Sequence, residues 1–340
     1  MNLTPLALPQ DARVVAVVGC SKNAGKTTTL NALLAGLDDV LNPGVLSIGI
    51  DGEEADFWLG VPKPRVEVRQ GDFVATAEAA LAAGTARIEI CARTGGRTLL
   101  GDLVVGRVTG NGSVLLAGIR AKDDVRAAVD AMRRLGVTRV LIDGAYQRLA
   151  AADPEVSDGT ILATGAVLGT TVEQVALRTQ EFLQRLRVPA SDIAGDHALM
   201  DAARSASRFA FRSAQDGDVV VADSPADPVA RRILESGDAV VAFPGAVGDD
   251  LLLQCAALSA GRLRLLAQDP TRLFLSVREA ATFQRRHALR VIRPIRVLAV
   301  TVNPFSVLGW TLPREALVEA VRAKAGGLPV VSFDVHPHPT

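Results

Sequence analysis

Residues 14–37, VVAVVGCSKNAGKTTTLNALLAGL, decide the fold class expected for this chain. The apolar, β-branched run at 13–18 ends at Gly19, a polar loop follows, and the pattern TTTLNALLAGL at 27–37 has helical spacing. A strand, a loop and a helix in this order direct the backbone N–H groups of the helix start toward a bound anion. The segment therefore predicts a phosphate-binding loop in an α/β fold.

The loop carries the groups that triphosphate binding needs. Gly25 lets the backbone approach a ligand closely, Lys26 can reach the terminal phosphates, and the Thr27 hydroxyl can bind Mg²⁺. A Gly-Lys-Thr triplet can also begin a helix by chance, but the strand before it and the helix after it favour nucleotide binding. The candidate cofactor-binding residues of the loop are Gly19, Ser21, Lys22, Asn23, Ala24, Gly25, Lys26, Thr27 and Thr28.

Two carboxylates follow buried-strand patterns further along the chain. The pattern at 45–50 ends at Asp51, and the pattern at 138–142 ends at Asp143. Ligands of open α/β sheets bind at the carboxyl ends of the strands, so both carboxylates are expected beside the phosphate loop. The alternative is that each carboxylate only caps the loop after its strand.

The rest of the chain alternates strands and helices, which predicts a mostly parallel sheet flanked by helices. Short alternating segments between 61 and 119 predict a β-rich insertion, with a hairpin turning at Asn111-Gly112. The expected order is a core at 1–60, the insertion at 61–119, more core at 120–187, an α/β extension at 188–290, and a strand-helix-strand segment at 291–340 that returns to the core.

The composition narrows the function classes. The chain has 340 residues, with 37 basic and 37 acidic side chains. A net charge of zero lacks the long-range field of a non-specific nucleic-acid or membrane binder, so no nucleic-acid or membrane partner is expected. Three dispersed cysteines predict neither a disulfide framework nor a zinc site. With no signal-like start and no apolar run near the ~20 residues of a membrane span, a cytoplasmic protein is expected.

The spacing of the loop resembles one group of P-loop ATPases. Five residues, rather than four, separate Gly19 from Gly25, as in the dethiobiotin synthetase and cobyric acid synthase group, which is related to the MinD and ParA proteins. Three other segments resemble the same group in the expected order. They are VLIDGA at 140–145, ATGAVLGTTVEQVALRT at 163–179 and VTVNP at 300–304.

This resemblance implies a P-loop NTPase sheet that binds ATP and Mg²⁺. It makes Asp143 a carboxylate on the Mg²⁺ side, Asp51 a residue that orients metal or the attacking water, and Asn303 a contact to adenine. Asn303 before a proline can also be a simple turn residue. The implied catalytic residues are Lys26, Asp51 and Asp143, and the implied metal ligands are Thr27, Asp51 and Asp143.

Lys22 resembles the extra lysine that MinD-like ATPases place across a dimer, which would make this chain a homodimer. It lies four residues before Lys26 rather than five. A solvated loop lysine that adds positive potential near the phosphates is the alternative.

A longer run resembles a more specific family. LSIGIDGEEADFWLGVPKPRVEVRQGDFVATAEAAL at 46–81, with CSKNAGKTTTLN at 20–31, is similar to KamB, the reactivase subunit family associated with lysine 5,6-aminomutase. The resemblance implies an ATPase that works with a MutS-like partner to reactivate an adenosylcobalamin-dependent aminomutase.

Two other functions stay open. One is a ligase resembling dethiobiotin or cobyric acid synthetase, but the next basic residue after Lys26 is Lys63, well beyond the first helix. The other is a non-catalytic, nucleotide-dependent adapter in cofactor metabolism. ATP is expected rather than GTP, because no Asn-Lys-x-Asp motif follows a strand.

Overall fold

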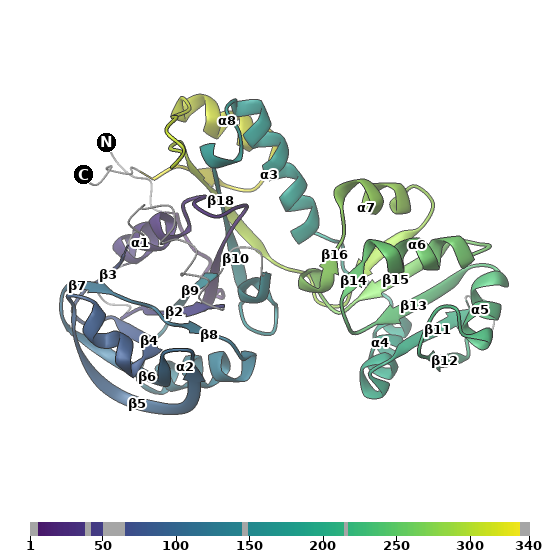
Figure 1. The fold of residues 1–340 in the computed structure, drawn as a ribbon, viewed down its shortest axis with the longest axis horizontal. Coiled ribbons are helices and arrows are strands. Elements are labelled where there is room, and N and C mark those ends of the chain that lie inside the picture. The colour runs from purple at the N-terminus through teal and green to yellow at the C-terminus, as the bar shows by residue number, and fades with distance from the viewer. Residues whose placement is uncertain (1–5, 38–41, 50–64, 145–148, 214–216, 334–340) are drawn as a thin grey trace. The chain divides into compact units, whose positions relative to one another are not determined.

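The computed structural model describes residues 6–37, 42–49, 65–144, 149–213 and 217–333. The chain forms two compact units, one made of Met1–Gln180 with Arg296–Thr340 and the other of Glu181–Ile295 (Figure 1). The first unit is drawn in purple, blue, teal and yellow, and the second in green. The chain thus leaves the first unit once and returns to it near its end.

The first unit is built on a ten-stranded sheet, in which a run of neighbouring strands that starts at one edge is parallel throughout. These strands are β19 (Val330–Val331), β18 (Val297–Asn303), β10 (Gly159–Gly165), β1 (Val14–Gly19), β9 (Val140–Gly144) and β2 (Gly44–Ile48), in this spatial order. The helices of this part of the chain are α1 (Lys26–Gly36), α2 (Lys122–Arg134), α3 (Val172–Leu186) and α8 (Arg314–Lys324), with 3₁₀ turns η4 (Leu149–Ala152) and η5 (Ala166–Leu168). The predicted α/β fold, with a mostly parallel sheet flanked by helices, is confirmed.

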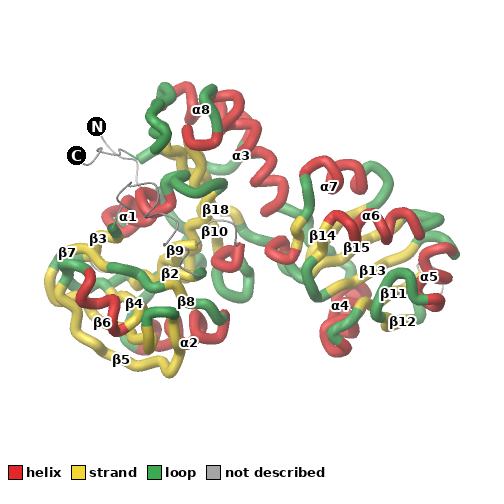
Figure 2. The backbone as a smooth tube through the Cα atoms, in the orientation of Figure 1, coloured by secondary structure: helices red, strands yellow, loops and turns green. Residues whose placement is uncertain are grey.

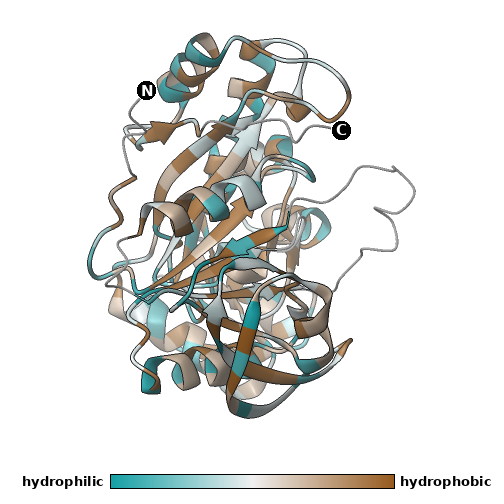
Figure 3. Ribbon diagram, turned by 90° about the vertical axis from the view of Figure 1, so that its left-hand side faces the viewer, coloured by the Kyte–Doolittle hydropathy of each residue, from teal (hydrophilic) through white to brown (hydrophobic). Residues whose placement is uncertain are grey.

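Local sequence explains the central elements. All of β1 is buried, as its unbroken run of apolar residues requires of a strand covered on both faces. The left-handed backbone of Gly25 (φ 97°, ψ 20°) then turns the chain into α1. Figure 3 shows hydrophobic residues along the strands, whereas the helices carry both kinds of residue.

The β-rich segment extends this sheet. Its elements are β3 (Val66–Val68), β4 (Phe73–Ala77), η3 (Glu78–Ala83), β5 (Arg87–Thr98), β6 (Gly101–Gly110), β7 (Gly112–Val114) and β8 (Gly118–Ile119). After β2 the sheet continues through β4, β6, β5 and β8, and β8 pairs with β2 again, so these strands close into a ring.

The predicted hairpin at Asn111-Gly112 is wrong. β7 pairs with β3, and the antiparallel neighbour that precedes β6 is β5. The Asn111 side chain accepts a hydrogen bond from the backbone N–H of Gln70 at 2.7 Å. The turn at Asn111 leads from β6 into β7, whose partner is β3. The hairpin turn lies instead at residues 99–100, between β5 and β6, and Gly101 directly after it has a φ of 124°.

The second unit has its own sheet, in the order β12 (Val219–Ala222), β11 (Phe209–Ser213), β13 (Ala239–Phe243), β15 (Leu263–Ala267) and β17 (Ala288–Val291). Its other elements are α4 (Ala194–Ala206), α5 (Pro228–Glu235), β14 (Val247–Gly248), α6 (Asp249–Leu258), η6 (Pro270–Arg272), β16 (Leu273–Phe274) and α7 (Val277–Gln284). Figure 2 shows its helices, in red, around the strands, in yellow. β13, β15 and β17 are parallel, and β11 runs antiparallel to both of its neighbours, β13 and β12.

Candidate functional site

The carboxyl ends of the parallel strands meet at one edge of the first sheet. Gly19 of β1 lies opposite Ala163 of β10, and Asn303 of β18 lies opposite Gly165, two residues further along β10. On the other side of β1, Val17 lies opposite Asp143 of β9. The loop that begins at Gly19, Asp143 and Asn303 therefore share this edge.

The strand order also reverses at β1. From β1 the chain passes through α1 to β2, which lies beyond β9 on one side, and it later crosses from β9 to β10 on the other side. Ligands of open α/β sheets bind at such a point, in the crevice outside the strand ends. The loop at 19–28 occupies this position.

A backbone hydrogen bond at its start and two left-handed residues near its end define the conformation of the loop. The backbone N–H of Cys20 donates to the Ala163 carbonyl at 2.9 Å, and Asn23 (φ 60°) and Gly25 (φ 97°) adopt left-handed backbone conformations. No side chain caps the start of α1, and its first turn carries no acidic residue. The partial positive charge of the helix start is therefore not neutralised from within the helix.

Lys26 lies back across the loop. A Cβ atom placed on Gly19 would be 3.0 Å from Cγ of Lys26, and the Lys26 ammonium donates to the Ser21 carbonyl at 3.5 Å. Glycine at position 19 thus leaves room for the lysine stem. Ser21, Lys22 and Asn23 are half-buried, and the Ser21 hydroxyl donates to the Lys22 carbonyl at 2.9 Å. Ala24 is buried, and Thr27 and Thr28 are half-buried.

Asp143 is half-buried near the end of β9. Its backbone carbonyl accepts a hydrogen bond from the Ser47 hydroxyl at 3.3 Å, which ties β9 to β2. A Cβ atom on the next residue, Gly144, would lie 2.9 Å from Cβ of Ala151, so η4 packs closely over this strand end. Asp51 lies outside the described residues, although β2 ends at Ile48, opposite Gly144.

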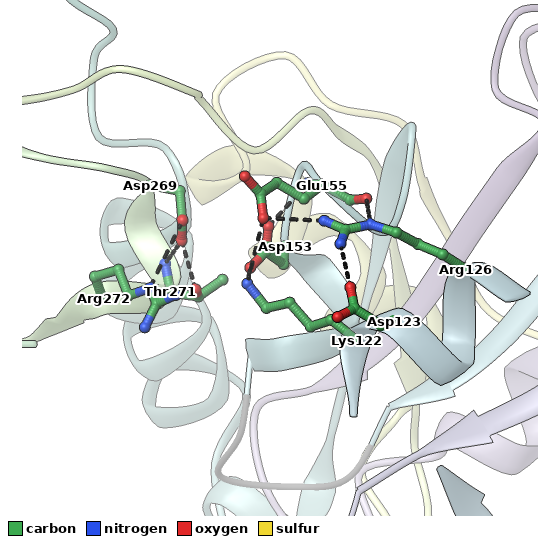
Figure 4. A network of polar contacts seen from close by, with 8 residues as sticks. All are labelled: Lys122, Asp123, Arg126, Asp153, Glu155, Asp269, Thr271 and Arg272. Carbon is green, nitrogen blue, oxygen red and sulfur yellow. Dashed lines mark hydrogen bonds and ion pairs between the residues drawn. The ribbon is translucent and has the colours of Figure 1, made fainter. Parts of the chain in front are cut away.

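An ion pair to the buried carboxylate of Asp153 joins α2 to residues that follow η4 (Figure 4). Lys122, in the first turn of α2, pairs with the fully buried carboxylate of Asp153. The other Asp153 oxygen accepts the backbone N–H of Glu155 at 2.8 Å, and Arg126 binds the Glu155 side chain at 3.1 Å. The same figure shows a separate contact in the second unit, where Asp269 binds Thr271. Lys122 and Arg126 thus anchor residues 153–155 to α2.

Asn303 lies against the loop at 19–28. A Cβ atom on Gly25 would lie 3.0 Å from Cβ and 3.4 Å from Nδ2 of Asn303, and the φ of 97° is one that other residues rarely adopt, so glycine is favoured there. Oδ1 of Asn303 accepts the backbone N–H of Phe305 at 3.1 Å, which is the turn role that the sequence left open. A small pocket lies at this contact and is lined by Ala24, Gly25, Thr28, Thr29, Thr301, Val302, Asn303 and Phe333.

Cys20 is a neutral thiol in this setting. Burial raises its pKa to about 12, against the smaller lowering effects of a hydrogen bond with Thr164 and of the Lys26 charge. A thiol with this pKa is protonated at neutral pH, so Cys20 packs as a small apolar residue. All three cysteines of the chain are free.

The sequence reasoning missed several residues of the site. The Trp310 indole N–H donates to the carbonyls of Ala166 (3.0 Å) and Gly169 (3.1 Å), which joins the loop after β18 to the loop after β10. The hydroxyls of Thr29 and Thr301 are 2.7 Å apart. Each of these contacts links residues more than a hundred positions apart, so no local pattern announces them. A weak signal existed for Thr301, which shares a strand face with Asn303.

The chemical groups of these residues suit a magnesium-bound nucleotide. Thr27 and Asp143 offer only oxygen ligands, which Mg²⁺ prefers, and Gly19 and Gly25 give the loop space that a Cβ would fill. In the part of the chain that the structure describes, no cluster of three or more His, Cys, Asp or Glu side chains could hold a metal ion. Mg²⁺ does not require one, because it usually keeps several waters and binds one or two carboxylates together with phosphates.

Comparison with known proteins identifies no relative. The chain matches no protein-family model, no curated protein and no solved structure. Within the described ranges, no helix has both the length and the apolar character to cross a membrane. The functional argument therefore depends on the site.

Proposed function

We propose that this chain binds Mg-ATP at the loop of residues 19–28 and hydrolyses it. The observation that carries the proposal is the meeting of this loop, Asp143 and Asn303 at the strand-order reversal beside β1. A glycine-rich loop followed by a helix start suits phosphate groups, and Lys26 adds a point charge for the terminal ones.

Each residue has a role in this proposal. The N–H groups at the start of α1 and the Lys26 ammonium hold the phosphates, and Asn303 contacts adenine beside Gly25. Thr27 and Asp143 hold Mg²⁺, and Asp51 orients the metal or the attacking water. When bound, Mg²⁺ would neutralise charge on the transferred phosphate.

We further propose that this ATPase serves as the ATPase subunit of a reactivation system for an adenosylcobalamin-dependent aminomutase, together with a MutS-like partner. This proposal rests on the sequence resemblance of residues 20–31 and 46–81, part of which lies outside the described residues. Coupling requires that nucleotide change the affinity of this chain for its partner, since a ligand that binds two states equally shifts neither. With its cysteines free, a cytoplasmic location suits the chain.

Phosphate release from ATP tests the proposed function. We expect Mg²⁺-dependent turnover of ATP by the purified chain, and restored mutase activity when inactivated mutase, the MutS-like neighbour and fresh adenosylcobalamin are added. Turnover only in the presence of a carboxylate substrate would point to a ligase instead, and ATP binding without turnover under any condition would point to an adapter. Reactivation that proceeds equally without ATP would contradict the coupling.

A further inference from the structure

A buried hydroxyl pair joins the phosphate-loop helix to the strand that ends at Asn303. The Oγ1 atoms of Thr29 and Thr301 are 2.7 Å apart, and each residue is only 2% exposed. Thr29 lies in the first turn of α1, where its backbone N–H donates to the Gly25 carbonyl at 2.9 Å. Thr301 lies two residues before Asn303 on β18. The pair thus connects segments 272 positions apart in sequence.

The hydrogen bond permits an approach that apolar side chains do not allow. Carbon atoms in contact are about 3.5–4.0 Å apart, about 1 Å more than the two hydroxyl oxygens here. The start of α1 therefore lies closer to β18 than a pair of valines would let it lie. The same close approach brings Gly25 against Asn303, where a Cβ would be only 3.0 Å from the Asn303 side chain.

The pair has a fixed relation to both ends of the proposed nucleotide site. Thr29 is one turn from Lys26 on the same helix, and Thr301 shares a strand face with Asn303, because side chains alternate along a strand. Thr29 and Thr301 also line the pocket at the contact of α1 with β18. A change in the distance between the two hydroxyls would therefore change the distance from the phosphate loop to Asn303.

We propose that the hydroxyl pair of Thr29 and Thr301 sets the separation between the phosphate loop and Asn303. It thereby makes the site selective for ligands that carry a base as well as a triphosphate. This inference rests on the proposed function, and both threonines are positioning residues that act through their neighbours. Fold stability alone does not require the pair, since replacing both partners of a buried hydrogen bond by apolar groups is often nearly neutral.

The test compares Mg-ATP with inorganic tripolyphosphate, a probe that can contact only the phosphate loop. In the variant Thr29→Val/Thr301→Val, calorimetry should show ATP affinity reduced about tenfold, equivalent to one or two lost neutral hydrogen bonds. Tripolyphosphate affinity should stay within about twofold of wild type, since the loop itself is unchanged. The variant Thr29→Ser/Thr301→Ser keeps both hydroxyls and should restore the wild-type ratio of the two affinities.

A second buried hydroxyl pair provides the matched control. Thr164 on β10 and Thr179 on α3 are also 2.7 Å apart and fully buried, but they do not join α1 to β18. Thr164 also hydrogen-bonds Cys20 of the loop, so the control variant is Thr179→Val alone, which breaks this second pair and should leave the ratio of ATP to tripolyphosphate affinity unchanged. If the valine pair at 29 and 301 prevents folding, Thr29→Ala/Thr301→Ala removes the hydrogen bond without added bulk and should lower the same ratio.

The outcomes separate this inference from the proposed function. Equal losses for both ligands, or an unchanged ratio in a folded Thr29 and Thr301 double variant, would overturn the positioning role while leaving nucleotide binding intact. A wild-type chain that binds neither ATP nor tripolyphosphate would overturn the proposed function, and the inference with it.

Discussion

Lys26→Ala is expected to weaken Mg-ATP binding about 10- to 150-fold. A hydrogen bond to a charged group contributes roughly 1.5–3 kcal/mol, and the variant removes the ammonium that lies across the loop beside Gly19. Calorimetry on the purified variant measures this loss directly. Because Lys26 is half-buried, the melting temperature of the variant is measured as well, to separate a loss of binding from a loss of fold.

Lys324→Ala is the matched control for that experiment. Lys324 ends α8 and is exposed, so its removal lowers the net charge equally without touching the loop. ATP affinity should stay at the wild-type value in this variant. Undiminished affinity in Lys26→Ala, or an equal loss in both variants, would contradict the assignment of the phosphate site.

Asp143→Asn is expected to keep the fold and lose Mg²⁺-dependent hydrolysis. The substitution preserves the shape of the side chain near the end of β9 but removes the charge that attracts the cation. Loss of an outer-shell partner of a metal site typically costs about 10–100-fold in metal affinity or activity, and loss of a direct ligand should cost at least as much. Phosphate release, measured against Mg²⁺ concentration together with the melting temperature, gives both quantities.

Asp158, in the same unit, is expected to stabilise the fold without a role in hydrolysis. Oδ2 of Asp158 accepts the backbone N–H of Val14 at 2.8 Å, at the other end of β1. Asp158→Ala should lower the free energy of unfolding by about 1 kcal/mol and leave hydrolysis per folded molecule unchanged. A large fall in melting temperature with unchanged hydrolysis in Asp143→Asn would show that Asp143 serves the fold instead.

The sequence was most informative where structure is local. The run of valines in β1 is buried on both faces, and Gly25 takes the left-handed conformation that begins α1. The strand-helix-strand order expected at 291–340 is that of β18, α8 and β19 in the structure. Each of these elements depends on residues within a few positions of one another, so its pattern is visible without knowledge of the fold.

Long-range pairing could not be predicted in the same way. Asn111-Gly112 has the composition of a hairpin turn, yet β7 pairs with β3, so the turn joins strands that are not partners. The contacts of Thr29 with Thr301 and of Trp310 with Ala166 depend on β18 lying beside β10. Nothing in the short strand patterns specifies which strands become neighbours.

Part of the candidate site could be predicted from the sequence because of the geometry of parallel sheets. Parallel strands bring their carboxyl ends to one edge, so Asp143 was expected near the loop, and the structure places it there. Asn303, expected only from the resemblance, ends β18 at the same edge. The direct contact of Asn303 with Gly25 was not foreseeable, because it depends on how closely α1 approaches β18. Asp51 lies outside the described residues, so its predicted place stays a prediction.

Hydrogen–deuterium exchange with and without Mg-ATP tests the central claim most directly. If nucleotide occupies the loop, exchange of the amides in 19–29 should slow on addition of Mg-ATP, and that in 303–305 should slow with it. Amides of α5 in the second unit, at 228–235, should exchange at the same rate in both samples. Slower exchange confined to the second unit, or no change at 19–29 at saturating Mg-ATP, would contradict nucleotide binding at this loop.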